Sequence, residues 1–498
     1  MGLPTMAADL NKGFRMSRRF GDKLMYIGGQ FVPGSSNQWI DSLNPGTEEV
    51  HGRVPLGTVE DVNAAVRAAK AAQPAWAEQS IGERRNLLRK VGAAMLARSA
   101  EVVSLEAADT GNTIASLGRD VEVAANYLDF FAGLGTELKG DSVPASKDGM
   151  HFSIREPYGV VARIVPFNHP FLFAGAHLAA PLMAGNTVII KTPETSPLSG
   201  SVMGEICREV LPPGVVNIVH GPGLPTGDAL VRHPEIWRIG FTGSVQTGMA
   251  IQRSAAEVAV KHVSLELGGK NPMIVCPDAD PATVAKAAVA GMNFAWAGQS
   301  CGSNSRLLVH ESLYDEVVER VVAQVSAIRV GDALDPTSQM GPVNSAGHYR
   351  RVLSFVESAR QDGAKLLTGG ERPQGEAFRR GYWLRPTVYG SVTMDMRIAR
   401  EEIFGPILAV LKWKTRDEAI AMANATEYGL ASGVWTNDLK EAMTFARALQ
   451  SGFVWINTTA RHFIGTPFGG WKNSGLGREE CLEELLSYTH NKAIHVFV

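Results

Sequence analysis

The sequence predicts an α/β fold built on a parallel β-sheet. From about residue 159, short apolar runs alternate with segments long enough for helices, a pattern typical of βαβ units whose strands are buried on both faces. The chain has 498 residues, of which 45% are hydrophobic and 20% charged. This composition is ordinary for a globular protein. The length exceeds what one hydrophobic core can organise, so we expect two or three domains.

The expected elements follow one another along the chain. Before residue 159, Thr58 and Ser80 each open a capping box at the start of a helix. Strands are then expected at Val160–Val165, Thr187–Ile190, Val215–Val219, Trp237–Phe241 and Val263–Leu267, and helices at Phe171–Ala184 and Ser199–Val210. A second α/β stretch predicts strands at Met273–Val275 and Leu307–Val309, helices at Ala282–Ala295 and Leu313–Val330, and a terminal strand at Ala493–Val498. A parallel sheet binds ligands at the carboxyl ends of its strands.

Charge and cysteine content argue against several classes of protein. The 48 Lys and Arg residues nearly balance the 50 Asp and Glu residues, so nothing favours nucleic acid or an anionic membrane as a partner. No apolar run is long enough to cross a bilayer, and the N-terminus lacks an apolar signal core. Four widely spaced cysteines without a C-x-x-C pair favour a reducing compartment and no metal site. We therefore expect a soluble cytoplasmic protein.

Cys301 differs from the other three cysteines in its surroundings. Cys207, Cys276 and Cys481 lie in apolar or helical contexts, where a buried, inert thiol is the ordinary interpretation. Cys301 lies in Gly298–Arg306, whose small polar residues cannot wall it into a core but would let a substrate approach the sulfur. From composition alone, a catalytic and an inert Cys301 remain equally open.

Three further segments carry polar groups at the ends of expected strands. Glu266 ends an apolar strand and precedes two glycines, where burial would raise its pKa toward that of a general base; a structural pair with Lys270 is the alternative. Asn168 offers an amide that could stabilise an oxyanion, or it belongs to a turn. Phe241–Gly248 runs from a strand into a helix, and such a helix start can receive a phosphate, although the motif is weak alone.

In their order and spacing, these segments closely resemble the aldehyde dehydrogenase superfamily, from about Met25 to Val498. Further matches are Pro193, Glu401–Pro406, Pro467–Gly470, Lys472, Ser474-Gly475 and Gly477–Glu479. The resemblance implies a Rossmann-type cofactor-binding domain (22–140 and 159–267), an α/β catalytic domain (268–478) and a small β oligomerisation arm (141–158 and 479–498). Residues 1–21 would form an N-terminal extension. A homodimer or homotetramer is implied as well.

The resemblance also implies roles for individual residues. Cys301 matches the nucleophile, Glu266 the general base and Asn168 the oxyanion-hole amide. The implied cofactor-binding residues are Phe167 on the adenine side, Lys191 and Glu194 at the adenosine ribose, Ser244 at the pyrophosphate, Glu402 and Phe404 at the nicotinamide, and in addition Gly223, Gly227, Thr242 and Gly243. Glu194 would repel a 2′-phosphate, so NAD is expected over NADP. The implied reaction is aldehyde oxidation by the hydrolytic branch of the family, through a thiohemiacetal and a thioester on Cys301.

The aldehyde itself is less well defined. In the resembling fold, the segment between Asn457 and Pro467 forms one wall of the aldehyde entrance, and here it contains Arg461, His462 and Phe463. Together with Phe173, these residues suggest an aldehyde that carries an acid group or a sizeable aromatic body. Alternatively, Arg461 points to solvent or to a neighbouring subunit.

One position departs from the family pattern. His177 stands where relatives commonly carry Lys or Arg, and it either relays a proton or merely packs on its helix.

Two rival functions use the same residues differently. A catalytically silent scaffold would show eroded chemistry, yet Cys301, Glu266 and Asn168 are all present. A cysteine hydrolase would need a Cys–His pair, and no sequence feature pairs a particular histidine with Cys301.

Overall fold

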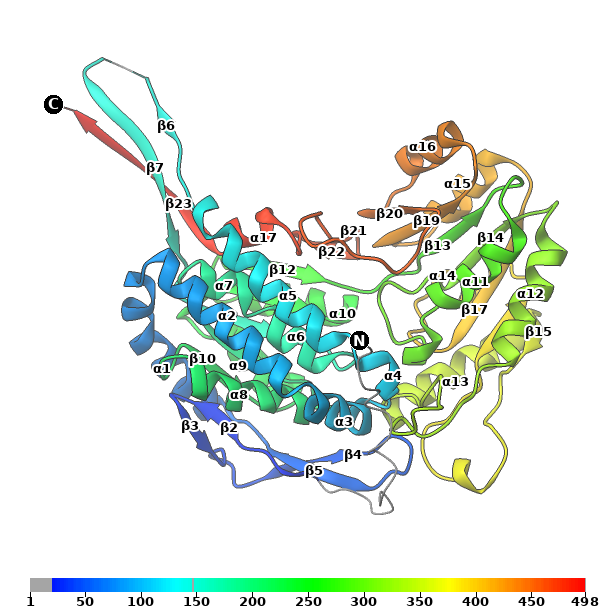
Figure 1. Ribbon diagram of the computed structural model, residues 1–498, viewed down its shortest axis with the longest axis horizontal. Coiled ribbons are helices and arrows are strands. Elements are labelled where there is room, and N and C mark those ends of the chain that lie inside the picture. The colour runs from blue at the N-terminus through cyan, green and yellow to red at the C-terminus, as the bar shows by residue number, and fades with distance from the viewer. Residues whose placement is uncertain (1–19, 146, 498) are drawn as a thin grey trace, which may run out of the picture.

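The computed structural model describes residues 20–145 and 147–497 and confirms the predicted α/β class. Two large sheets of mainly parallel strands stand at the left and right of Figure 1, each covered by helices, and a narrow antiparallel sheet projects at the upper left. Nearly all of the predicted extension 1–21 lies outside the described residues.

The first large sheet has eight strands and contains all five strands predicted between residues 159 and 267. Its five central strands run parallel to one another, and the outer strands pair antiparallel. In spatial order the strands are β22 (Gly475–Leu476), β12 (His262–Glu266), β11 (Ile236–Thr242), β8 (Val160–Ile164), β9 (Thr187–Lys191), β10 (Val216–Val219), β2 (Met25–Ile27) and β3 (Gln30–Val32).

Helices pack on both faces of this sheet because successive residues of each strand point to opposite sides. Val160 and Ala162 of β8 join the core formed with α1 (Val59–Glu78), α9 (Asp228–Arg232) and α10 (Val245–Ala256). Val161 joins the core on the other face. That core holds α2 (Ile81–Ala97), α3 (Ser99–Thr110), α5 (Asp120–Gly133), α6 (Pro170–Ala176), α7 (Ala179–Met183), α8 (Leu198–Val210) and α17 (Leu482–Leu486). The capping boxes predicted at Thr58 and Ser80 are present.

The helix expected over Phe171–Ala184 is interrupted and forms α6 and α7. His177 ends α6, and α7 begins two residues later with Pro181 in its first turn. Proline has no N–H to donate, and its ring collides with the carbonyl group four residues earlier, which here belongs to His177. The break therefore places His177 at the junction of the two helices.

The second large sheet has seven strands and parallel pairing except at one edge. In spatial order its strands are β15 (Lys365–Thr368), β16 (Thr387–Gly390), β17 (Ile407–Trp413), β14 (Arg306–His310), β13 (Pro272–Val275), β19 (Ala431–Trp435) and β20 (Phe453–Ile456). Its cores hold α11 (Pro281–Gly291), α12 (Tyr314–Ser326), α13 (Ala346–Gln361), α14 (Arg397–Arg400), α15 (Arg416–Asn424) and α16 (Leu439–Ala448). The helices predicted at Ala282–Ala295 and Leu313–Val330 are present but end earlier.

The projecting sheet pairs the end of the chain with residues near 150. Its strands β6 (Ser142–Val143), β7 (Gly149–Pro157) and β23 (Thr489–Phe497) are antiparallel, and β7 covers the whole length of β23 (Figure 1). The remaining elements are β1 (Gly21–Asp22), β4 (Trp39–Leu43), β5 (Val50–Pro55), β18 (Tyr428–Gly429), β21 (Trp471–Lys472) and α4 (Ile114–Leu117). In the described part of the chain, no helix is long and apolar enough to span a membrane.

The connection between the two large sheets positions the site. Strand β12 ends at Glu266, and β13 of the second sheet starts at Pro272. Only residues 267–271 separate them, so the carboxyl ends of the first sheet face the amino ends of β13 and β14. The Cys301 segment immediately precedes β14.

Candidate active site

One large cavity lies where the two sheets meet, with a volume of about 850 Å³. Five parallel strands of the first sheet deliver residues to it from their carboxyl ends or from the loops that follow them, as expected for this type of sheet. The second sheet contributes Cys301 and the segment around Glu402. Of the residues singled out in the sequence, the cavity is lined by Phe167, Asn168, Phe173, Lys191, Glu194, Gly223, Gly227, Thr242, Gly243, Ser244, Glu266, Cys301, Glu402 and Phe404.

Cys301 is partly exposed and lies on a loop held by backbone contacts. The amide of Asn271 donates to the carbonyl oxygens of Cys301 (2.7 Å) and Ser303 (3.0 Å). Gly298 has φ +68, and a Cβ there would lie 2.2 Å from the oxygen of Gly405, so only glycine lets this loop pass. Burial, together with the nearby Glu266 and Glu402 carboxylates, raises the pKa of the Cys301 thiol to about 12. The thiol must therefore lose its proton to a base when it reacts.

Glu266 is buried at the end of β12, and neither carboxylate oxygen has a hydrogen-bond partner among the described residues. Lys270 is likewise buried with an unpartnered ammonium nitrogen, so the structural Glu266–Lys270 pair that the sequence left open is not formed. Burial first, and then the neighbouring Glu479, raise the pKa of Glu266 well above its usual value. A buried carboxyl group left unpaired is costly unless it has a task.

Asn168 is fixed from both sides in the loop after β8. Its side-chain amide donates to the backbone carbonyl oxygen of Gln299 (2.9 Å), two residues before Cys301. The backbone carbonyl oxygen of Asn168 accepts from the side chain of Asn112 (2.7 Å). An amide group has two N–H donors, so one remains beyond the hydrogen bond to Gln299. The Asn168 amide is thus tied to the backbone of the cysteine loop.

The first-sheet side of the cavity has the features of a dinucleotide site. Helix α10 begins there with Ser244 as its N-cap, whose hydroxyl accepts from the Thr247 N–H (3.3 Å), and the positive end of a helix favours a phosphate. Lys191 is buried with its ammonium group 3.5 Å from the Glu194 carboxylate, while the Glu194 side chain is half exposed. The glycines at 223 and 227 leave room beside them. These residues fit a nucleotide with a pyrophosphate.

The opposite wall carries Glu402 and a cluster of rings. A Glu402 oxygen accepts from the Gly269 N–H (2.9 Å), and burial raises the pKa of Glu402 to about 7. Phe404 adopts a left-handed backbone conformation (φ 57), which is strained for a bulky residue and is found at functional sites. Its ring lies 5.7 Å from that of Phe167. This neighbour favours placing Phe167 at the Phe404 end of the cavity, whereas the resemblance placed it on the adenine side.

His177 lies behind the cavity, stacked on Phe173 with ring centroids 5.3 Å apart. Neither ring nitrogen forms a hydrogen bond within the described residues, and Nε2 lies 3.8 Å from a Glu479 oxygen. Burial and then Arg163 lower the pKa of His177 to about 3, so the ring is neutral at physiological pH. Glu479 instead has a firm partner in the Arg163 guanidinium, at 2.8 Å.

Arg461, His462 and Phe463 do not line the cavity. All three are exposed, and Phe463 retains 71% of its accessible surface. His462 is held by the Glu480 carboxylate (2.9 Å) and stacks on Phe453. These contacts fix the segment without directing Arg461 toward Cys301.

The sequence did not point to several residues that the fold brings to the site. His348 on α13 lines the cavity, hydrogen-bonds the Phe404 carbonyl oxygen (2.6 Å) and packs against Phe167. Asn271 and Asn112 hold the two loops described above. Their partners lie 30 to 56 residues away along the chain, so no local pattern in a single sequence could have revealed these contacts.

Comparisons with known proteins agree with this geometry. The sequence profile of the Aldehyde dehydrogenase family matches residues 31–494. The chain is 45% identical over 479 residues to aldehyde dehydrogenase tropH of Talaromyces stipitatus, a match covering 95% of this chain and 93% of that protein. Two of the similar solved structures are complexes with NAD. The NAD⁺ complex of a Bacillus cereus aldehyde dehydrogenase has a TM-score of 0.93 at 37% identity, covering 96% and 97% of the two chains. The NAD complex of PnpE, a protein also solved from Pseudomonas sp. WBC-3, has a TM-score of 0.93 at 38% identity, covering 96% and 98%.

Proposed function

Since the chain belongs to the aldehyde dehydrogenase family and is therefore an oxidoreductase acting on aldehydes, we propose that it oxidises an aldehyde to a carboxylic acid with NAD, through a thioester on Cys301. One observation carries this proposal. The Cys301 thiol, the unpartnered Glu266 carboxyl group and the Asn168 amide line the same cavity as the residues that fit a dinucleotide. The proposal assigns the cavity to the hydrolytic reaction of the family.

The first half of the reaction forms and oxidises a covalent adduct. The Cys301 thiol passes its proton to solvent water, and the thiolate sulfur adds to the aldehyde carbon. The carbonyl oxygen becomes an oxyanion, which the free N–H of Asn168 and the Cys301 backbone N–H stabilise. When bound, NAD supplies the acceptor for the hydride that leaves this carbon. The oxyanion collapses to a carbonyl group, and Cys301 is left as a thioester.

The second half releases the acid. Glu266 takes a proton from a water molecule, and the hydroxide adds to the thioester carbon. The Asn168 amide again holds the oxyanion, the carbon–sulfur bond breaks, and the carboxylic acid leaves. Because burial raises the pKa of Glu266, its carboxylate is a stronger base than an exposed one, which suits the proton transfer from water.

The cofactor-binding residues support a preference for NAD. Glu194 lies at the rim beside Lys191, where its carboxylate can accept hydrogen bonds from a ribose hydroxyl but would repel a phosphate. Ser244 at the start of α10 suits the pyrophosphate, and Glu402 with Phe404 suits the nicotinamide end. Phe173 and the entrance residues Arg461, His462 and Phe463 remain candidates for contact with the aldehyde.

Assembly and location form a smaller part of the proposal. The projecting sheet exposes apolar side chains, with Val143, Met150 and Phe497 retaining 53%, 61% and 72% of their surface. An exposed apolar strand surface of this kind favours association, so we expect a homodimer or homotetramer joined through β6, β7 and β23. A cytoplasmic location and the division into domains remain predictions from the sequence.

The two rival functions are separated by one assay. In the described part of the chain, no histidine hydrogen-bonds Cys301, which removes the pair that a cysteine hydrolase requires. Absorbance growth at the NADH band, recorded with purified protein, NAD and a panel of aliphatic, aromatic, amino- and acid-bearing aldehydes, tests the proposal. NADH should form only when aldehyde is present. The proposal would be refuted if no aldehyde gave NADH. It would also be refuted if the only activity found were the hydrolysis of esters in the absence of cofactor.

A further inference from the structure

We propose that His169, oriented by Asp120 and Glu106, determines substrate specificity by accepting a hydrogen bond from a hydroxyl group on an aromatic aldehyde. The inference rests on the proposed function and names the substrate class of the same site. It starts from a buried cluster that the reaction itself does not use: Glu106 at the end of α3, Asp120 at the start of α5, and His169 immediately after Asn168.

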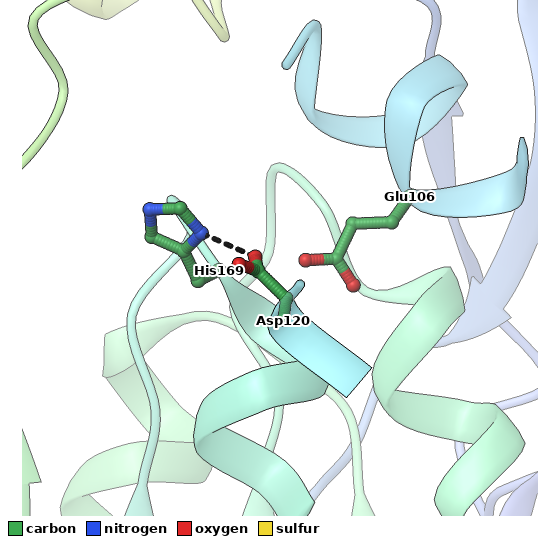
Figure 2. Close-up of side chains that lie close together, drawn as sticks. All are labelled: Glu106, Asp120 and His169. Atoms are coloured by element: carbon green, nitrogen blue, oxygen red, sulfur yellow. Dashed lines mark hydrogen bonds and ion pairs between the residues drawn. The ribbon is translucent and has the colours of Figure 1, made fainter. Parts of the chain in front are cut away.

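The imidazole of His169 has one nitrogen committed to the cluster. Nδ1 lies 2.7 Å from an Asp120 oxygen, and both side chains are buried. A carboxylate can only accept, so Nδ1 carries the proton in this hydrogen bond. Figure 2 shows the other ring nitrogen pointing away from both carboxyl groups. Nε2 is therefore left with its lone pair free, as a hydrogen-bond acceptor.

Glu106 lies next to Asp120 and supports the hydrogen bond between Asp120 and His169. Its carboxyl group points toward Asp120 in Figure 2. One of its oxygens accepts from the Phe171 N–H (3.1 Å), and the other has no partner among the described residues. Burial, and then the nearby Asp120, raise the pKa of Glu106 well above its usual value. A raised pKa favours the uncharged form of Glu106, which places its carboxyl group behind Asp120 without a strong repulsion.

The ring of His169 lies between the segment that leads to Cys301 and a side chain of the cavity wall. His169 follows Asn168, and its ring packs edge-on against Trp296 of the cysteine loop, with centroids 4.6 Å apart. It also lies 6.4 Å from Phe173, which lines the cavity. His169 does not itself line the cavity shared by Cys301 and the cofactor-binding residues, so we place the aromatic body of the substrate beyond Phe173, beside Trp296. Nε2 forms no hydrogen bond in the described part of the chain, yet it is not sealed from solvent as both nitrogens of His177 are.

These surroundings define the chemistry of the ligand. The rings of Trp296, Phe173 and His169 form apolar walls that suit a flat aromatic body. Within those walls, a single oriented acceptor selects a donor, and a ring hydroxyl is the donor that an aromatic aldehyde most simply offers. A buried acceptor left without a donor is costly, so an otherwise similar substrate that lacks the O–H should bind less well.

The test compares hydroxybenzaldehydes with their methoxy counterparts, which lack the O–H donor and carry one more methyl group. kcat/KM is measured with NAD for the 2-, 3- and 4-hydroxybenzaldehydes and for their methoxy counterparts, at a pH where the phenols stay protonated. We expect the wild type to favour one hydroxy isomer over its methoxy partner by about five- to tenfold, the usual effect of one neutral hydrogen bond. In His169→Phe, which keeps a ring but removes the acceptor, this ratio should fall to near one.

Two more variants separate specificity from stability. Asp120→Leu removes the acceptor that fixes the tautomer, so the hydroxy-to-methoxy ratio should also fall, whereas a loss of packing alone would lower both rates and leave the ratio unchanged. His310→Phe is the matched control: His310 hydrogen-bonds Ser312 (2.8 Å) and packs on Trp413, away from the cavity. The ratio should stay at its wild-type value in this variant.

Several outcomes would overturn the inference while the proposed function stands. These are NADH formation from aliphatic aldehydes only, a wild-type ratio near one for every isomer, and a preference for carboxybenzaldehydes that disappears in His169→Phe. The last result would mean that His169 acts as a cation. The hydroxy-to-methoxy ratio of the wild type tests the inference by itself, so the inference can be contradicted even if a variant fails to fold. If no aldehyde at all reduces NAD, the proposed function fails instead.

Discussion

The reaction cavity and the entrance segment 458–466 both carry polar side chains, but these side chains differ in burial and in their partners. In the cavity, Glu266 is buried and unpartnered, and its pKa is raised. In the segment, Arg461 is exposed, and His462 is paired with Glu480. Removal of water from a charged group in the cavity costs free energy, and such a group is therefore more reactive. The charges of the segment, in contrast, are screened by water. Substitutions in the cavity should thus have far larger effects than substitutions in the segment.

The largest effect is expected at the cysteine. Cys301→Ser should lower aldehyde oxidation by several orders of magnitude, since the nucleophile is lost, while NAD still binds. Steady-state NADH formation and a fluorescence titration with NAD measure the two properties. Cys481→Ser is the control, because Cys481 is buried away from the cavity. Near-normal turnover in Cys301→Ser would remove the covalent mechanism.

A smaller effect is expected at the rim of the cofactor site. Glu194 is half exposed, so its repulsion of a 2′-phosphate is partly screened and amounts to about 1 kcal/mol or somewhat more. The wild type should prefer NAD, and Glu194→Gln should raise kcat/KM for NADP relative to NAD by roughly tenfold. Equal efficiency of the two cofactors in the wild type would show that Glu194 does not select between them.

The smallest effect is expected in the entrance segment. If Arg461 contacts a substrate carboxylate, Arg461→Ala should reduce kcat/KM for an acid semialdehyde but not for a neutral aldehyde of similar length. Because the side chain is exposed, we expect a loss of no more than about 1 kcal/mol, roughly fivefold. A loss of a hundredfold for the acid substrate alone would mean that the segment closes over the cavity. Equal changes for both aldehydes would exclude Arg461 from recognition.

Much of the fold could be predicted because its signals are local. The strands of the first sheet are short apolar runs with polar or glycine-containing ends, and such runs report burial directly. The break at His177 was missed because the helical pattern continues across it, while the cause is the ring of Pro181. The helix expected to run to Ala295 ends at Gly291, where Asn293 and Ala297 adopt left-handed backbone conformations that propensity does not foresee.

The residues of the candidate site also fall into those that the sequence indicates and those that only the fold reveals. Cys301, Glu266 and Asn168 stand in distinctive sequence contexts, and the resemblance supplied the rest of the cofactor residues. His348, Asn271 and the pair formed by His169 and Asp120 depend on contacts between distant elements. A lone buried histidine in a sequence has too many ordinary explanations to be singled out. Only the packing shows which of its nitrogens is committed and which is free.

The central claim is that Glu266 serves the hydrolysis of a thioester on Cys301. Rapid mixing of Glu266→Gln with NAD and aldehyde, followed by acid quenching and mass spectrometry of the Cys301 peptide, tests it directly. A burst of about one equivalent of NADH per active site, followed by slow turnover, should accompany an acyl mass on Cys301. Full steady-state turnover, or an absent burst with an unmodified Cys301, would contradict the claim.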